Sequence, residues 1–267
     1  MKRKWQRNWK QKLMKKLATP VLAGMMLFSS YNTALANPSG GVVTAGAAAI
    51  STNGSTMTVN QTTNKAAINW QSFGIGSGET VRFIQPSASS VALNRVVGGN
   101  ASAIYGTLSA NGKVFLVNPS GILFAPGSQV NVGGLVASTL NLSDSDFLKG
   151  NYSFTKNGAA GSVMNRGTIR TADGGYVAFL GPQVRNEGLV AAQAVGLAAG
   201  DKVSLDFDGD KLLSFRVDTQ AAGAAATNSG SLLAAGGTVV MSTGTKDALL
   251  STVVNNTGLI QARTVNS

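Results

Sequence analysis

The chain contains neither cysteine nor histidine among its 267 residues. These absences exclude disulfide bonds, Ser-His-Asp and Cys-His nucleophiles, and zinc or haem sites built on His or Cys ligands. Catalysis would depend on carboxylates, Lys, Tyr, Ser or Thr alone. We therefore expect a protein that is not an enzyme and holds no metal or cofactor, and that is stabilised by packing alone.

Charged residues are also scarce, at 12% of the chain, and the two signs are unevenly distributed. Eight of the 22 basic residues and none of the 11 acidic residues lie in residues 1–36, which leaves a net charge of only +3 for the rest. The overall charge of +11 therefore does not indicate a nucleic-acid partner.

The basic segment at the start is followed by a short apolar run, Leu17 to Phe28, and then by Ala34-Leu35-Ala36. This order is typical of a secretory signal peptide with an extended basic region, cleaved between Ala36 and Asn37. The alternative is a membrane anchor, but an apolar run of this length spans only ~18 Å of a bilayer core of ~30 Å. We expect residues 1–36 to be removed.

A short motif, Asn-x-Gly followed by aliphatic residues, recurs in the second half of the chain. It begins at Asn165, Asn186, Asn228 and Asn256, and Asn131 begins an earlier relative of it. The last four starts lie 21, 42 and 28 residues apart, so we expect the interval of 42 to contain one degenerate repeat. A period near 20 residues with turn-forming corners predicts a solenoid.

The composition of this repeat predicts short stacked strands. Asn and Gly accept left-handed backbone geometry at corners, and segments such as Val203 to Phe207 and Gln129 to Val132 alternate as strands do. Coils stacked at ~4.8 Å bury one aliphatic column and align the corner Asn side chains in ladders. We therefore predict an all-β fold, a parallel β-helix of about ten coils and ~50 Å in length.

A β-helix exposes unpaired strand edges at its first coil unless a cap covers them. Residues 37–64 are polar, rich in Gly and Thr and lack the repeat, so we expect an N-terminal cap there. No linker is visible, and residues 37–267 are expected to form one domain. The chain stops soon after its last corner, which favours a module of a longer protein or a short stand-alone version.

A more specific pattern occupies the first half of the mature chain. It consists of the phrases Ile68-Asn-Trp70-Gln-Ser-Phe73, Leu93-Asn-Arg95-Val96, Ile104-Tyr-Gly106-Thr-Leu108 and Phe115-Leu-Val-Asn118-Pro119-Ser120-Gly121-Ile122. Together they resemble the secretion domain of two-partner secretion exoproteins, the filamentous haemagglutinin N-terminal or haemagglutination activity domain family. The resemblance covers about Asn37 to Thr264 and is closer to the high-molecular-weight adhesin branch.

The hallmark of that family is Asn-Pro-Asn-Gly-Ile, from which this chain departs only by Ser120 in place of the second Asn. The second motif of the haemagglutinin branch, Asn-Pro-Asn-Leu, has no match, since Gln85-Pro86-Ser87-Ala88 stands in the comparable region. The candidate site therefore comprises Asn118, Pro119, Ser120, Gly121 and Ile122. These residues form either a contact for a transporter or a type I turn that pins one coil, and we favour the structural role.

The resemblance implies a secretion-targeting and folding-nucleating N-terminal domain of an adhesin-type exoprotein. The chain would cross the inner membrane by the general secretory translocon and be recognised in the periplasm by an outer-membrane β-barrel transporter with POTRA domains. It would then fold as a right-handed, single-stranded β-helix with small extra-helical hairpins, secreted from or attached to a Gram-negative cell. We expect a monomer, and sparse charge and the lack of disulfides suit passage through a pore.

Two other functions remain open. In the first, the β-helix itself would bind host glycans, receptors or cells as an adhesin. In the second, it would be a polysaccharide lyase or hydrolase, although its 11 acidic residues are scattered, whereas such enzymes use paired carboxylates.

Asp206-Phe-Asp208-Gly-Asp210 resembles part of a calcium loop but lacks the later Glu. We therefore predict a hairpin turn there, between strands at Val203–Phe207 and Leu212–Val217. Trp70 and Phe73 are expected to pack beneath the cap.

Overall fold

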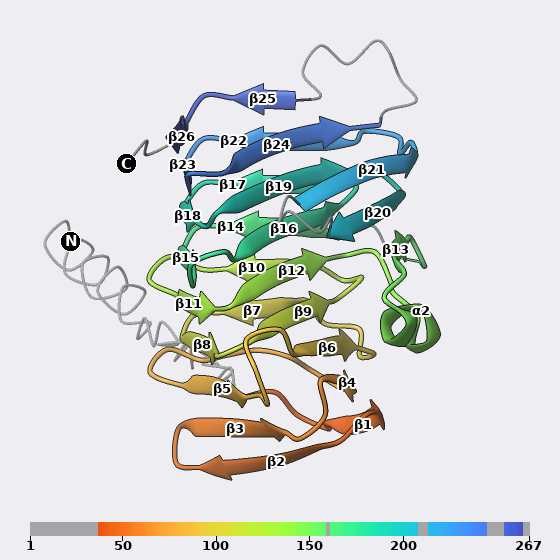
Figure 1. The fold of residues 1–267 in the computed structure, drawn as a ribbon, viewed down its shortest axis with the longest axis vertical. Helices are drawn as coiled ribbons and strands as arrows, with labels where there is room; N and C mark the ends of the chain where they lie inside the picture. Colours follow the sequence, from red (N-terminus) through yellow and green to blue (C-terminus); the bar gives the residue numbers. More distant parts are fainter. Residues whose placement is uncertain (1–36, 159–160, 208–212, 245–253, 264–267) are drawn as a thin grey trace, which may run out of the picture. The chain divides into compact units, whose positions relative to one another are not determined.

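We describe a computed structural model of the chain, in residues 37–158, 161–207, 213–244 and 254–263 (Figure 1). The expected signal peptide, with Ala36, lies outside these residues, as does the turn that contains Asp208 and Asp210. In the part of the chain that is described, no helix has both the length and the apolar character needed to cross a membrane.

The described chain winds into a right-handed parallel β-helix whose coils stack along one axis and whose three sides are β-sheets (Figure 1). The first sheet, called the covered sheet here, contains β1 (Val42–Ala45), β4 (Lys65–Trp70), β6 (Val91–Val96), β9 (Lys113–Val117), β12 (Gly134–Ser138), β16 (Tyr176–Gly181), β19 (Ala194–Ala199) and β24 (Thr238–Thr243). The nine-stranded sheet contains β2 (Ala48–Asn53), β3 (Thr56–Gln61), β5 (Thr80–Ile84), β8 (Thr107–Ala110), β11 (Gln129–Val132), β15 (Thr168–Thr171), β18 (Leu189–Ala191), β23 (Ser231–Ala235) and β26 (Leu259–Arg263). The six-stranded sheet contains β7 (Ser102–Ile104), β10 (Ile122–Phe124), β14 (Ser162–Asn165), β17 (Gln183–Asn186), β22 (Ala225–Asn228) and β25 (Val254–Asn256).

The interior of the β-helix is filled by aliphatic side chains that lie in register from coil to coil. One column of the nine-stranded sheet runs through the buried side chains of Met57, Val81, Leu108, Val130, Ile169, Val190 and Leu232 and ends at Ile260, which is 38% exposed. Each fully buried aliphatic side chain contributes about 1.5–3 kcal/mol before entropy is subtracted. The predicted aliphatic column is confirmed.

The number of coils is smaller than the sequence led us to expect. From β3 to β26, eight parallel strands succeed one another in the nine-stranded sheet, against about ten expected coils. The difference arises because the chain leaves the helix after β12 and again after β19 to form elements outside it.

The corner asparagines form the expected ladder. Asn165, Asn186 and Asn228 are buried, and the Nδ2 atom of each donates to the Oδ1 atom of the next corner Asn at 2.7 Å. The last acceptor in this chain of hydrogen bonds is Asn256. The ladder therefore links coils that are separated by 21, 42 and 28 residues in the sequence.

Two details of the repeat prediction were wrong. The interval of 42 residues contains no degenerate coil, because β17 pairs directly with β22. Its additional residues include two antiparallel strands outside the helix, β20 (Lys202–Phe207) and β21 (Leu213–Thr219). They lie where the sequence predicted the two strands of a hairpin. Asn131 is not a corner either, since it is exposed within β11 and Phe124 occupies the ladder position of its coil.

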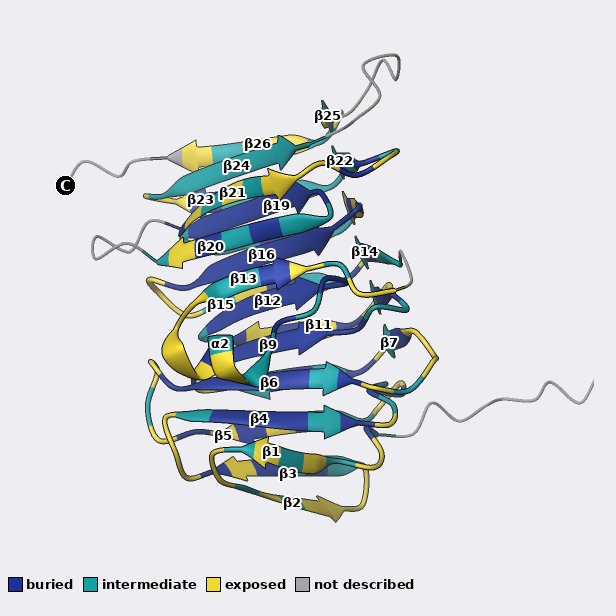
Figure 2. Cartoon of the chain, turned by 90° about the vertical axis from the view of Figure 1, so that its right-hand side faces the viewer, coloured by how far each residue is buried: buried dark blue, intermediate teal, exposed yellow. Residues whose placement is uncertain are grey.

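From β4 to β19 the covered sheet has buried side chains on both faces, because elements outside the helix pack on its outer side (Figure 2). These elements are α2 (Asp144–Lys149), β13 (Tyr152–Thr155) and the hairpin β20–β21. A second hydrophobic core forms between them and the sheet. Double burial explains why β12, β16 and β19 are almost continuously apolar instead of alternating.

The first coil is closed by antiparallel strands. β1 pairs antiparallel with β4, and β2 pairs antiparallel with β3, within the segment where a cap is expected. The rings of Trp70 and Phe73 are buried against each other with centroids 5.6 Å apart. A Cβ atom on Gly41 would lie 2.6 Å from the Trp70 ring, so the cap rests directly on this residue, as expected.

Candidate functional site

The candidate turn begins at Asn118, whose side chain is fully buried between β9 and β10. Its Nδ2 atom donates to the carbonyl oxygen of Asn100 at 3.0 Å and to the Oγ atom of Ser102 at 2.9 Å. Its Oδ1 atom accepts from the backbone N–H of Ser120 at 2.9 Å. Asn118 thus closes its own turn and ties that turn to the preceding coil.

The backbone of the turn is bonded to the coils on both sides. The N–H of Gly121 donates to the carbonyl of Asn118 at 3.0 Å, which closes a four-residue turn with Pro119 at its second position. Gly121 accepts from the N–H of Ser102 at 2.9 Å, and Pro119 accepts from the N–H of Gly161 at 3.1 Å. The φ angle of Gly121 is 120°, a region that favours glycine.

These contacts show how the turn accommodates Ser120 in place of the second Asn of the motif that it resembles. The bond that closes the turn uses the backbone of Ser120, so Ser in place of Asn leaves this bond unchanged. Ile122 is buried at the start of β10, whereas Pro119 and Ser120 are half-buried at the surface. The five residues therefore lie together as one turn, without a titratable group.

A second corner, at Gln85, was not recognised as important from the sequence. Gln85 is 5% exposed, and its Oε1 atom accepts from the N–H of Gly112 at 3.0 Å. Its Nε2 atom donates to Gln61 Oε1 at 3.1 Å and to the carbonyl of Ser90 at 3.2 Å. A glutamine thus fixes three coils in the region where the haemagglutinin branch has Asn-Pro-Asn-Leu. The following Pro86 was the available signal for such a corner.

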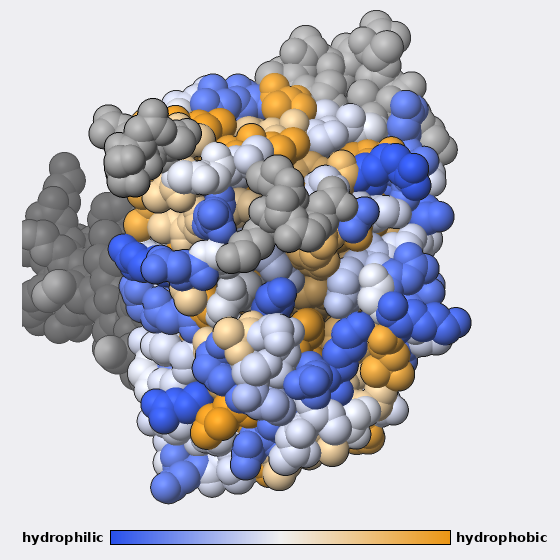
Figure 3. Space-filling model, viewed as in Figure 1, coloured by the Kyte–Doolittle hydropathy of each residue, from blue (hydrophilic) through white to orange (hydrophobic). Residues whose placement is uncertain are grey.

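A metal site built from acidic side chains requires several of them to lie close together. Within the described residues, no cluster of three or more carboxylates is close enough to hold a metal ion. Asp206 lies exposed on β20 and belongs to no such cluster within the described residues. On the face turned to the viewer in Figure 1, hydrophobic residues form several patches separated by hydrophilic ones (Figure 3).

Comparison with known proteins gives matches of two kinds. The chain is 43% identical over 173 residues to a heme/hemopexin-binding protein of Haemophilus influenzae strain Rd, and 45% identical over 111 residues to another H. influenzae protein of that name. These alignments cover 61% and 42% of this chain but 19% and 12% of the relatives, so the chain spans less than a fifth of their length.

Solved structures match most of the chain. The HMW1 secretion domain of H. influenzae superposes with a TM-score of 0.74 at 28% identity, covering 84% of this chain and 58% of that chain. The filamentous hemagglutinin secretion domain gives a TM-score of 0.52 at 16% identity, over 84% of this chain and 100% of that chain, which shows the fold alone.

The family model of the TPS secretion domain matches residues 34–267, the whole of the described β-helix. The resemblance seen in the sequence and the predicted β-helix are both confirmed. The chain therefore belongs to the TPS secretion domain family of two-partner secretion exoproteins.

Proposed function

We propose that this domain targets its exoprotein to a partner transporter and nucleates folding after export. Membership of the TPS secretion domain family, over residues 34–267, is the observation that supports this role. In this proposal, the translocon exports the chain, a signal peptidase cleaves between Ala36 and Asn37, and an outer-membrane β-barrel with POTRA domains recognises the mature domain. The domain then folds at the surface of the Gram-negative cell and has no catalytic role.

The proposed targeting role is tested by expressing residues 1–267 with and without a two-partner secretion transporter. The domain should reach the medium or the cell surface only with the transporter. Equal export in cells that lack any such transporter would contradict the proposal. Sequencing the N-terminus of the exported protein tests cleavage before Asn37, independently of the transporter.

We propose that the turn at Asn118 serves export mainly through folding. Its amide is buried and fully engaged with neighbouring backbone and Ser102, so it presents no polar group to a partner in the folded domain. Only Pro119 and Ser120 remain available for a direct contact.

Replacing Asn118 with Ala should lower both stability and export. The substitution removes three hydrogen bonds and leaves buried partners unsatisfied, which is expected to reduce the free energy of unfolding by about 2–4 kcal/mol. Thermal melting of the purified domain and the exported fraction of the expressed protein are the measurements. Export should fall several-fold.

Ser120→Ala is the matched control, because the turn uses only the backbone N–H of Ser120. It should melt and be exported like the unaltered domain if the turn acts through folding. Reduced export of Asn118→Ala with unaltered melting would instead assign a direct transporter contact. Unaltered melting and export of Asn118→Ala would exclude both roles.

The identity to heme/hemopexin-binding proteins supports a second proposal, about the longer protein to which the relatives correspond. We propose that the exported exoprotein binds haem or hemopexin, or host glycans and cells as an adhesin, through residues beyond this domain. This chain lacks His and Cys, the side chains that most often hold haem iron. Residues 37–267 should therefore not retain haem, and because hemopexin is proposed to bind beyond this domain, they should not retain hemopexin in a pull-down either. Retention of either one would place its binding in the domain itself.

A further inference from the structure

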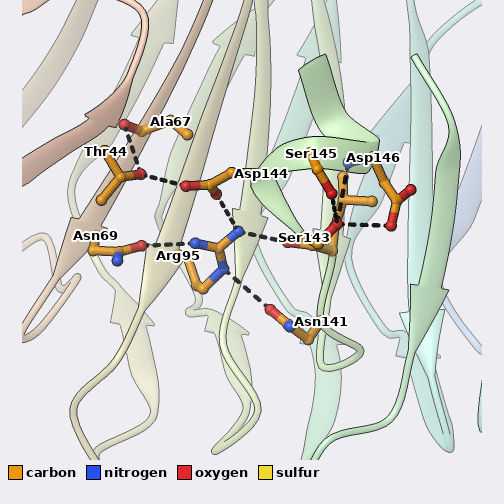
Figure 4. Close-up of polar contacts among 10 residues, drawn as sticks. Thr44, Ala67, Asn69, Arg95, Asn141, Ser143, Asp144, Ser145 and Asp146 are labelled. Atoms are coloured by element: carbon orange, nitrogen blue, oxygen red, sulfur yellow. Dashed lines mark hydrogen bonds and ion pairs between the residues drawn. The ribbon is translucent and has the colours of Figure 1, made fainter. Parts of the chain in front are cut away.

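The side chain of Arg95, in β6, lies at the centre of a polar cluster on the outer side of the covered sheet (Figure 4). Its Nη1 atom donates to Asn69 Oδ1 at 2.8 Å, and its Nε atom donates to Asn141 Oδ1 at 3.1 Å. Its Nη2 atom donates to the carbonyl of Leu142 at 2.5 Å and to Asp144 Oδ1 at 2.7 Å. The guanidinium of Arg95 therefore joins its own strand, β6, to β4 and to residues 141–144.

The same cluster reaches the N-terminal cap. The hydroxyl of Thr44, in β1, donates to Asp144 Oδ2 at 2.7 Å across 100 residues of sequence. The two oxygens of Asp144 thus bind Arg95 on one side and the cap strand on the other (Figure 4). Asp144 is the first residue of α2, which follows the N-cap residue Ser143.

The other end of α2 is attached to the same coil. The Nζ atom of Lys65, at the start of β4, donates to the carbonyls of Phe147 at 2.9 Å and Leu148 at 3.0 Å. Free carbonyls at a helix C-terminus favour such a cation. The short helix is thereby anchored at both ends to the two strands, β4 and β6, that follow the cap.

Burial makes the partners of Arg95 interdependent. The side chain of Arg95 is 15% exposed, and that of Asp144 is 32% exposed. Burial alone would raise the pKa of Asp144, but hydrogen bonds from Arg95 and Thr44 and the charge of Arg95 hold this pKa below its usual value. Loss of the Asp144 charge from the folded domain would leave Arg95 partly buried without its counter-ion, which is unfavourable.

We propose that residues 141–149 act as a strap that locks the N-terminal cap, so that β1 is held firmly on β4 only after α2 has docked on Arg95. The cap then depends on the strap for its protection, although some 100 residues separate them, whereas the strap does not depend on the cap. This inference rests on contacts within the domain and does not require the transporter.

Hydrogen exchange of the purified domain, followed by mass spectrometry, tests the strap. Thr44→Val keeps the size of the side chain but removes the bond to Asp144, together with the longer contact of the same hydroxyl with the carbonyl of Ala67 at 3.4 Å. Asp144→Asn, which keeps the Ala67 contact, is therefore the decisive variant. Thr44→Val should increase exchange in β1 and β2 by about ten-fold or more while α2 keeps its protection. Asp144→Asn should increase exchange in β1, β2 and α2 together, because it removes the counter-ion of Arg95. Exchange in β16 and β19 should not change in either variant.

Asp146→Asn is the matched control within the same helix. Asp146 binds Ser143 and Asn151 but has no bond to Arg95 or to the cap, so this variant should leave β1 protected. Wild-type exchange of β1 in both Thr44→Val and Asp144→Asn would overturn the proposal. An equal rise in every strand would also overturn it, because that result describes a general loss of stability and not a lock on the cap.

Discussion

Replacing Gly188 with Ala is expected to cause one of the largest losses of stability that a single substitution can produce in this domain. A Cβ atom at this position would lie 2.2 Å from the carbonyl oxygen of Gly167 in the preceding coil. That oxygen accepts from the N–H of Leu189 at 2.9 Å, so it cannot move without breaking the ladder between coils. We expect a decrease of more than about 4 kcal/mol in the free energy of unfolding, measured by denaturant titration.

The clash recurs along the axis, which makes the prediction general for this corner. A Cβ atom on Gly230 would lie 2.1 Å from the oxygen of Gly188, and one on Gly258 would lie 2.1 Å from the oxygen of Gly230. Gly99→Ala is the control, since a Cβ there meets no atom within 4 Å. Gly99→Ala should change stability by less than about 0.5 kcal/mol. Similar stabilities for Gly188→Ala and Gly99→Ala would show that the coils are not closely stacked at the corner.

Replacing Phe115 with Ala is expected to detach the elements outside the helix from the covered sheet. Phe115 is fully buried, and its ring centroid lies 5.4 Å from that of Tyr152 and 6.2 Å from those of Phe147 and Phe154. Loss of such a ring from a core usually costs about 3–5 kcal/mol. The measurements are denaturant titration and limited proteolysis, which should show new cleavage between residues 142 and 155.

Tyr105→Ala provides the control for loss of an aromatic side chain, because Tyr105 is 40% exposed on the outer surface. It should leave both the stability and the proteolysis pattern almost unchanged. If Phe115→Ala lowered stability without new cleavage between residues 142 and 155, the second core would not be what holds α2 and β13 in place.

The sequence was informative wherever one physical cause dominates a position. The corner ladder follows from Asn165, Asn186 and Asn228, because a buried amide in a stack of coils finds its best partner in the same amide of the next coil. The turn at Asn118 likewise follows from local chemistry, since Asn and Pro specify it within a few residues.

The sequence was uninformative where distant segments meet. Nothing near Arg95 indicates that its counter-ion lies 49 residues further on, in a helix of six residues that is too short to give a periodic signal. The second core was missed for a related reason. A strand that is buried on both faces and a strand in an ordinary core have the same apolar composition, and only the outer elements distinguish them.

The interval between Asn186 and Asn228 has a practical consequence. The hairpin β20–β21 is inserted between them, yet β17 and β22 pair in register and the two amides bond at 2.7 Å. Neighbouring coils thus pair through their own side-chain and backbone contacts, even where many residues separate them in the sequence. An insertion between β17 and β22 therefore leaves the stacking of the coils intact, and a guest peptide carried by the outer strands β20 and β21 would be displayed outside the β-helix.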